Sequence, residues 1–184
     1  MKTMLLTGIS ALMLAGTAQA QIAIVNQTIS PTEVQAAQQA WCKALVDISK
    51  THAASGQPAA KALAEKVIDS AYGYQMGAML FKPTLTVNPQ TFRTTRAGAL
   101  AYFVGGDAAY PKDTGFALKG WTQCEISNAG IFITGNSATS MGKGSFTGKD
   151  GKVTTVDKTW GYVRDDAGKL RITLHHSSLE YSGS

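Results

Sequence analysis

The sequence is poor in the features that usually identify a function. It has two cysteines and three histidines in 184 residues, and it contains no phosphate-binding glycine loop, no paired CxxC motif and no HExxH motif. Its 17 Lys and Arg outnumber its 12 Asp and Glu, but the excess is spread along the chain rather than clustered. We therefore expect neither a nucleotide-binding loop nor a zinc protease site, and no nucleic-acid partner.

Apolar residues are plentiful but do not form a membrane span. Hydrophobic residues make up 44% of the chain and charged residues 16%, which is typical of a globular protein. The one long apolar run, residues 4–15, is shorter than the roughly 20 residues that cross a bilayer. Lys2 precedes this run and small residues at 17–20 follow it, which predicts a signal peptide over residues 1–20, cleaved after Ala20. The expected product is one domain, 21–184, periplasmic or secreted and without a membrane partner.

The predicted export makes a disulfide between the two cysteines, Cys42 and Cys124, possible. In an oxidising compartment two thiols that lie close together form a disulfide. Two separate buried thiols fit the sequence equally well, because spacing along the chain does not give the distance between the Cα atoms.

Helical signals dominate the first half of the mature chain. Ser30, Pro31 and Glu33 form a capping box with proline at the first helical position, which predicts a helix to about residue 52. A turn over 53–58 and a second helix over 60–72 follow. A strand over 79–87 and a short helix over 97–104, capped by Thr94 or Thr95, complete this half.

The second half alternates as strands do. The expected strands are residues 118–127, 130–134, 138–147, 153–164 and 170–178, with turn sequences at 149–152 and 165–168. Helices followed by strands predict an α+β fold, in which a curved antiparallel sheet wraps around the N-terminal helices.

The last expected strand carries the most distinctive pattern. Arg171, Thr173, His175 and Ser177 share one face, and His176 lies on the other, because side chains alternate along a strand. The adjacent histidines therefore cannot readily bind one zinc ion. The polar face is either solvated or lines a cavity between sheet and helices, and the residues alone leave both open.

Four segments carry a resemblance to a known family: HHSS at 175–178, FKPT at 81–84, ALAYF at 99–103 and DKTW at 157–160. Together, over nearly all of the mature chain, they resemble the iota-class carbonic anhydrases. That resemblance implies a cone-shaped α+β fold of the SnoaL-like superfamily, which includes the association domain of calcium/calmodulin-dependent kinase II. It also implies a homodimer formed through sheet faces.

The resemblance further implies reversible hydration of carbon dioxide to bicarbonate. The catalytic residues carried over by motif are Thr84, Tyr102, His175 and Ser177, with Thr84, Tyr102 and Ser177 also holding the substrate. No cofactor is implied, although a divalent metal has been claimed for some members. The chemistry is coherent, because hydroxyl groups can orient water and a neutral histidine can accept or relay its proton.

Two other functions compete with this hypothesis. The alternative is a non-catalytic ligand-binding or oligomerisation module, because folds of this kind host many functions. It predicts a ligand pocket or an oligomer interface without turnover, and scattered positions of the four residues would favour it. A nucleotide hydrolase is the weaker option. Of the remaining residues, Arg93 and Arg96 are candidates for guiding bicarbonate, and Asp157 is expected to pair with a nearby Lys or Arg.

Overall fold

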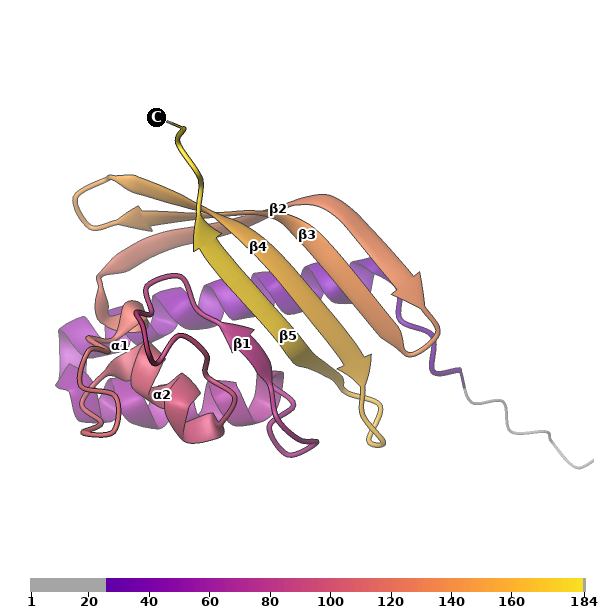
Figure 1. Cartoon of the computed structure of the whole chain (residues 1–184), viewed down its shortest axis with the longest axis horizontal. Helices are drawn as coiled ribbons and strands as arrows, with labels where there is room; N and C mark the ends of the chain where they lie inside the picture. The colour runs from indigo at the N-terminus through magenta and orange to yellow at the C-terminus, as the bar shows by residue number, and fades with distance from the viewer. Residues whose placement is uncertain (1–25, 184) are drawn as a thin grey trace, which may run out of the picture.

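Helices and strands form two layers, with the helices covering one face of the sheet (Figure 1). The computed structural model describes residues 26–183, so the predicted signal peptide lies outside the described residues. No helix within 26–183 is long and apolar enough to cross a membrane. The α+β prediction is confirmed.

The first helix, α1 (Pro31–Ala71), is a bent element with two arms. Its start is the predicted capping box: Ser30 Oγ accepts a hydrogen bond from the Glu33 backbone N–H at 3.3 Å, and Glu33 Oε2 accepts one from the Ser30 N–H at 2.8 Å. The bend is at Gly56, whose φ of 75° interrupts the helical backbone inside the predicted turn. Both arms line one small apolar cavity that includes Trp41 and Ile68, so they pack against each other as expected.

The sheet of the described residues has the order β1-β5-β4-β3-β2. Its members are β1 (Leu80–Lys82), β2 (Trp121–Thr134), β3 (Ser137–Gly148), β4 (Val153–Arg164) and β5 (Leu170–Leu179). The four long strands are antiparallel neighbours, as the turn sequences predicted. The expectation of a purely antiparallel sheet is wrong at one edge, because β1 pairs with β5 in parallel. No hairpin connects these two strands, so no turn imposes an antiparallel direction.

Two strand boundaries also differ from the prediction. The strand expected over 79–87 ends at Lys82, because Pro83 has no backbone N–H to continue the ladder. The strands expected over 118–127 and 130–134 are one strand, β2, with a register shift between Asn128 and Gly130. That irregularity explains why the sequence alternation changes phase there.

The short helix α2 (Arg96–Val104) lies next to β1 at one end of the sheet (Figure 1). Thr95 caps it, with Oγ1 accepting from the Gly98 N–H at 3.2 Å, and Gly105 ends it. A 3₁₀ turn, η1 (Phe116–Leu118), follows before β2.

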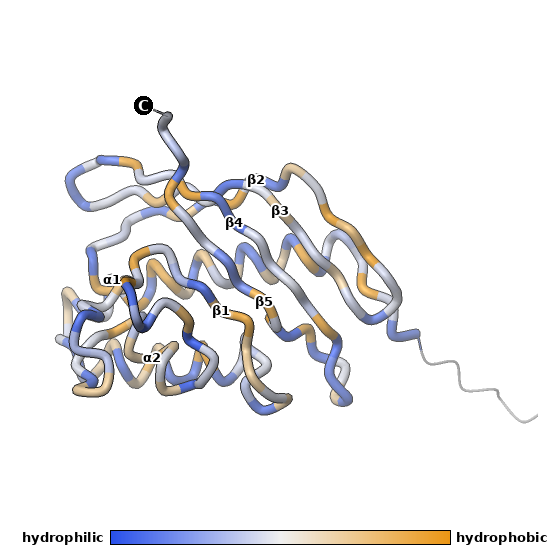
Figure 2. The backbone as a smooth tube through the Cα atoms, in the orientation of Figure 1, coloured by the Kyte–Doolittle hydropathy of each residue, from blue (hydrophilic) through white to orange (hydrophobic). Residues whose placement is uncertain are grey.

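The core lies between the helices and the inner face of the sheet. Hydrophobic and hydrophilic stretches are interspersed along the strands in Figure 2, in keeping with the alternation of inward and outward side chains. On β4 the buried side chains are those of Val156, Lys158, Trp160 and Tyr162, beside the buried Gly161. Three of these four are aromatic or aliphatic, and the fourth is a lysine.

Candidate active site

A small, partly open cavity lies where β1, β5 and α2 meet. Its volume is about 10 Å³, which is room for about one water molecule. All four residues expected from the sequence, Thr84, Tyr102, His175 and Ser177, line it. The other lining residues are Trp41, Phe81, Pro83, Phe103, Phe116 and Lys158. The convergence of the four expected residues favours the enzyme hypothesis over the binding module.

Three hydroxyl groups form the polar side of this cavity. Thr84 Oγ1 and Ser177 Oγ are 2.6 Å apart and share a hydrogen bond. Thr84 is placed by β1, which ends two residues before it, and Ser177 is on the inner face of β5. Burial raises the pKa of Tyr102, although hydrogen bonds with Leu85 and Thr84 oppose the shift. Tyr102 is therefore a neutral phenol at pH 7 and can donate a hydrogen bond.

His175 is held on all sides. Its Nδ1 is 2.9 Å from the Tyr72 hydroxyl and its Nε2 is 2.7 Å from Lys158 Nζ. Phe81 and Trp160 each lie 4.7 Å from its ring centre. Burial, and then the Lys158 ammonium, lower the pKa of His175 well below its usual range, so the ring is neutral at pH 7. Because both ring nitrogens are engaged by protein groups, His175 forms part of a hydrogen-bond chain from Tyr72 to Lys158 rather than contacting substrate directly.

Lys158 also lines the cavity, and it is not among the residues that the sequence motifs predicted for the site. Its side chain is buried beside His175, and among residues 26–183 it forms no ion pair with a carboxylate. Burial lowers the pKa of Lys158 to about 7. A signal was present in the sequence, because alternation places Lys158 on the same face as Val156 and Trp160, inside an apolar stripe.

The arginines expected to guide bicarbonate have other partners. Arg93 is buried and donates to both carboxylate oxygens of Asp113, at 2.7 and 2.8 Å from Nη2. Arg96 pairs with Asp69 on the surface. Because both charges are matched by carboxylates, the structure does not support the proposed guiding role. Asp157, in contrast, pairs with Lys143 at 2.7 Å, as expected.

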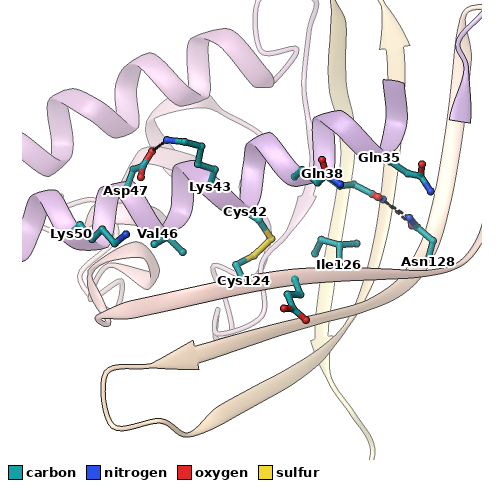
Figure 3. A pocket seen from close by; sticks show the side chains of 12 residues that line it. Gln35, Gln38, Cys42, Lys43, Val46, Asp47, Lys50, Cys124, Ile126 and Asn128 are labelled. Carbon is teal, nitrogen blue, oxygen red and sulfur yellow. Dashed lines mark hydrogen bonds and ion pairs between the residues drawn. A yellow bond between two sulfur atoms is a disulfide. The ribbon is translucent and has the colours of Figure 1, made fainter. Parts of the chain in front are cut away.

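A larger groove of about 820 Å³ lies elsewhere, between α1 and β2 (Figure 3). It contains none of the four expected residues. Cys42 and Cys124 form a disulfide in its wall, with their Cα atoms 5.1 Å apart, which resolves the alternative left open by the sequence. Beside the disulfide, the Gln38 and Asn128 side chains exchange two hydrogen bonds at 2.8 and 2.7 Å. In this groove, a disulfide and a pair of hydrogen-bonded amide side chains therefore connect α1 to β2.

The two adjacent histidines lie as the alternation predicted. His175 is buried and His176 is exposed, on opposite faces of β5. Within residues 26–183, no group of three or more His, Cys, Asp or Glu side chains is placed to hold a metal ion.

A family model and a curated relative both match this chain, and they name the same family. Residues 32–179 match the family model of the metal-independent carbonic anhydrases. A metal-independent carbonic anhydrase from Nostoc sp. (strain PCC 7120 / SAG 25.82 / UTEX 2576) is 62% identical over 168 residues, covering 91% of this chain and 82% of that protein.

Solved structures agree with this match. The crystal structure of a cyanobacterial iota-carbonic anhydrase complexed with bicarbonate is 63% identical, with a TM-score of 0.86, and covers 89% of this chain and 100% of that one. A calcium/calmodulin-dependent protein kinase II association domain from Xanthomonas campestris has a TM-score of 0.55 at 22% identity and the same coverage. The second likeness shows the fold alone.

Proposed function

The chain belongs to the family of metal-independent carbonic anhydrases, and from that membership we propose that it catalyses the reversible hydration of carbon dioxide to bicarbonate in the cavity at Thr84, Tyr102 and Ser177. The observation that carries this proposal is the convergence of three hydroxyl groups in a small cavity that aromatic residues also line. The bicarbonate bound by a relative of 63% identity supports it.

The apolar walls and the hydroxyl groups have separate tasks. Phe81, Pro83 and Phe116 give carbon dioxide, which is nonpolar, a dry surface beside the hydroxyl groups. Within the pair of Thr84 and Ser177, one hydroxyl donates to the other, so one hydroxyl hydrogen is left for the oxygen that becomes negative. The Tyr102 phenol is a further donor to bicarbonate.

Water activation must come from the protein's own groups in a family described as metal-independent, in agreement with the expectation of no cofactor. A metal ion would lower the pKa of bound water towards 7. Without that effect, a general base supplies about 10²- to 10⁴-fold in rate. Holding water against the substrate carbon supplies the remainder.

Stopped-flow measurement of carbon dioxide hydration by chelator-treated protein tests the proposal. We expect a rate clearly above that of buffer alone, unchanged by added divalent metal. Thr84→Val and Ser177→Ala should each lower it, because they remove the hydrogen-bonded hydroxyl pair while preserving most of the side-chain volume. A wild-type rate equal to buffer would overturn the activity. Full activity in both variants would place the reaction outside this cavity.

We also propose that the protein is exported and acts in the periplasm or outside the cell. The disulfide between Cys42 and Cys124 supports this location, since such bonds persist in oxidising compartments. Mass spectrometry of protein recovered from the periplasm should give a mature chain that begins at Gln21. Retention of Met1 in the cytoplasmic fraction would contradict the proposal.

A homodimer formed through the outer face of the sheet is a further part of the proposed function. Phe132 and Met141 are 74% and 61% exposed on the face opposite the helices, where a second copy could cover them. Light scattering should give twice the chain mass for the wild type and a shift towards monomer for Met141→Glu. A monomeric wild type at micromolar concentration would refute the dimer.

A further inference from the structure

A buried lysine with no acidic partner among residues 26–183 lines the wall of the candidate active site. Lys158 is 3% exposed, and its nearest polar partner is the imidazole of His175, at 2.7 Å from Nζ. In the sheet register it lies directly opposite Ser177, on the same inner face. The role proposed for this residue rests on the proposed hydration activity.

The sheet makes room for the lysine stem. A Cβ atom at Gly144, on the neighbouring strand β3, would lie 3.2 Å from Lys158 Cγ and 3.3 Å from its Cε. The absence of a side chain at residue 144 therefore leaves room for the lysine stem on the inner face of the sheet, while Nζ reaches His175 on β5. This placement fixes the amine at the cavity rather than at the surface.

Opposing effects act on the charge of the amine. Burial favours the neutral form, whereas the rings of Trp41, Phe146 and Trp160, at 4.5, 5.5 and 5.4 Å from Nζ, favour the ammonium. The other titratable groups around it are His175 on β5, Tyr72 at the end of α1 and Tyr102 on α2, all neutral at pH 7. Lys82, His176 and Asp157 are less buried. The amine is thus poised to gain or lose a proton near neutrality.

We propose that Lys158 is the general base of the hydration reaction. Water oxygen forms a bond to the carbon of carbon dioxide while one O–H bond of that water breaks, and its proton passes to the lone pair of Lys158 Nζ. The products are bicarbonate and an ammonium, and the new positive charge develops beside the new negative charge. The ammonium then returns the proton to a buffer base, which restores the amine for the next turnover.

The contacts of His175 allow this exchange without breaking a hydrogen bond. The base role requires the tautomer with the ring proton on Nδ1, where it donates to the Tyr72 hydroxyl oxygen, which also accepts from Trp41 Nε1 at 2.9 Å. Nε2 then accepts from Lys158, whether the lysine is an amine or an ammonium. In the amine form the lone pair is free to face the cavity. Tyr72 and His175 are therefore positioning residues for the base.

The pH dependence of hydration distinguishes this role from a structural one. We expect kcat/KM of the wild type to rise through an inflection near pH 7 as the amine becomes neutral. Lys158→Met, which preserves the stem, should lose about 10²-fold or more at pH 8 and lose the inflection. Lys152→Met, in the exposed turn before β4, is the matched control and should behave as the wild type.

A direct titration makes the outcome independent of activity. In ¹³C- and ¹⁵N-labelled protein, the Lys158 Cε signal, assigned by its absence in Lys158→Met, should shift with a midpoint near pH 7, far below the other lysines. Unchanged kcat/KM and inflection in a folded Lys158→Met protein would overturn the base role and leave the hydratase activity intact. A carbamate signal from ¹³C-labelled carbon dioxide on Lys158 would also overturn it, because the amine would then be a nucleophile. Absence of hydration in the wild type would instead overturn the proposed function itself, and this role with it.

Discussion

Arg93 and Lys158 are both buried cations, but their surroundings differ completely. Arg93 is 2% exposed and is matched by both oxygens of Asp113. Lys158 is 3% exposed and faces a neutral imidazole and three aromatic rings. The first arrangement fixes a permanent charge, and the second leaves a charge free to change. Equal burial therefore does not imply an equal role, and the lack of a carboxylate partner within residues 26–183 distinguishes Lys158 as the cation that can exchange a proton.

Breaking the Arg93–Asp113 ion pair should have the largest effect on the free energy of unfolding. Asp113→Ala leaves the Arg93 guanidinium buried without its counter-ion, which costs about 3–5 kcal/mol in the free energy of unfolding. Urea denaturation at pH 7 measures this loss. Asp69→Ala, which breaks the exposed Arg96 pair, is the control and should cost less than about 1 kcal/mol. Equal losses in the two variants would contradict the structural role given to the buried pair.

Replacing Lys158 should raise the free energy of unfolding rather than lower it. Lys158→Met replaces a poorly compensated amine with an apolar chain, so we expect a gain of about 1–4 kcal/mol at pH 7. The pKa of Lys158 is about 7 in the folded protein and near its ordinary value of 10.5 in the unfolded chain. Between these values the unfolded chain binds more protons, so wild-type stability rises with pH. The advantage of Lys158→Met should therefore shrink from pH 7 to pH 10.

Denaturant titrations of both proteins at the two pH values check this prediction. Loss of stability in Lys158→Met at pH 7, or an advantage that grows with pH, would show that Lys158 is stabilised as a charge. The comparison with Arg93 would then fail.

The smallest expected effect comes from filling the space that Gly144 leaves beside the Lys158 side chain. Gly144→Ala should crowd Lys158 and cost on the order of 1 kcal/mol, with a lower hydration rate and a shifted Lys158 titration. Gly130→Ala, on β2, meets no atom within 4 Å and is the matched control. If the two variants have equal rates, the contact at Gly144 does not position the base.

Local signals in the sequence were sufficient for much of this molecule. The capping box at Ser30, the Thr95 cap and the turn sequences between the long strands depend on neighbouring residues, and the structure contains them all. The motif residues Thr84, Tyr102, His175 and Ser177 were predicted to share a pocket, and they line one cavity.

Contacts between distant segments explain what the sequence could not give. The parallel pairing of β1 with β5 and the meeting of Cys42 with Cys124 depend on how the layers dock. Lys158 was visible as a lysine in an apolar stripe, but its partner on β5 was not. A buried amine and a snorkelling surface lysine have the same local sequence pattern, and only the packed structure separates them.

Exchange of ¹⁸O between labelled carbon dioxide and water, followed by mass spectrometry at chemical equilibrium, tests the central claim most directly. The wild type should deplete the label far faster than buffer alone, and Lys158→Met should lose about 10²-fold or more of that acceleration at pH 8. Equal depletion by the wild type and Lys158→Met would contradict the account of a buried amine that takes the proton of water.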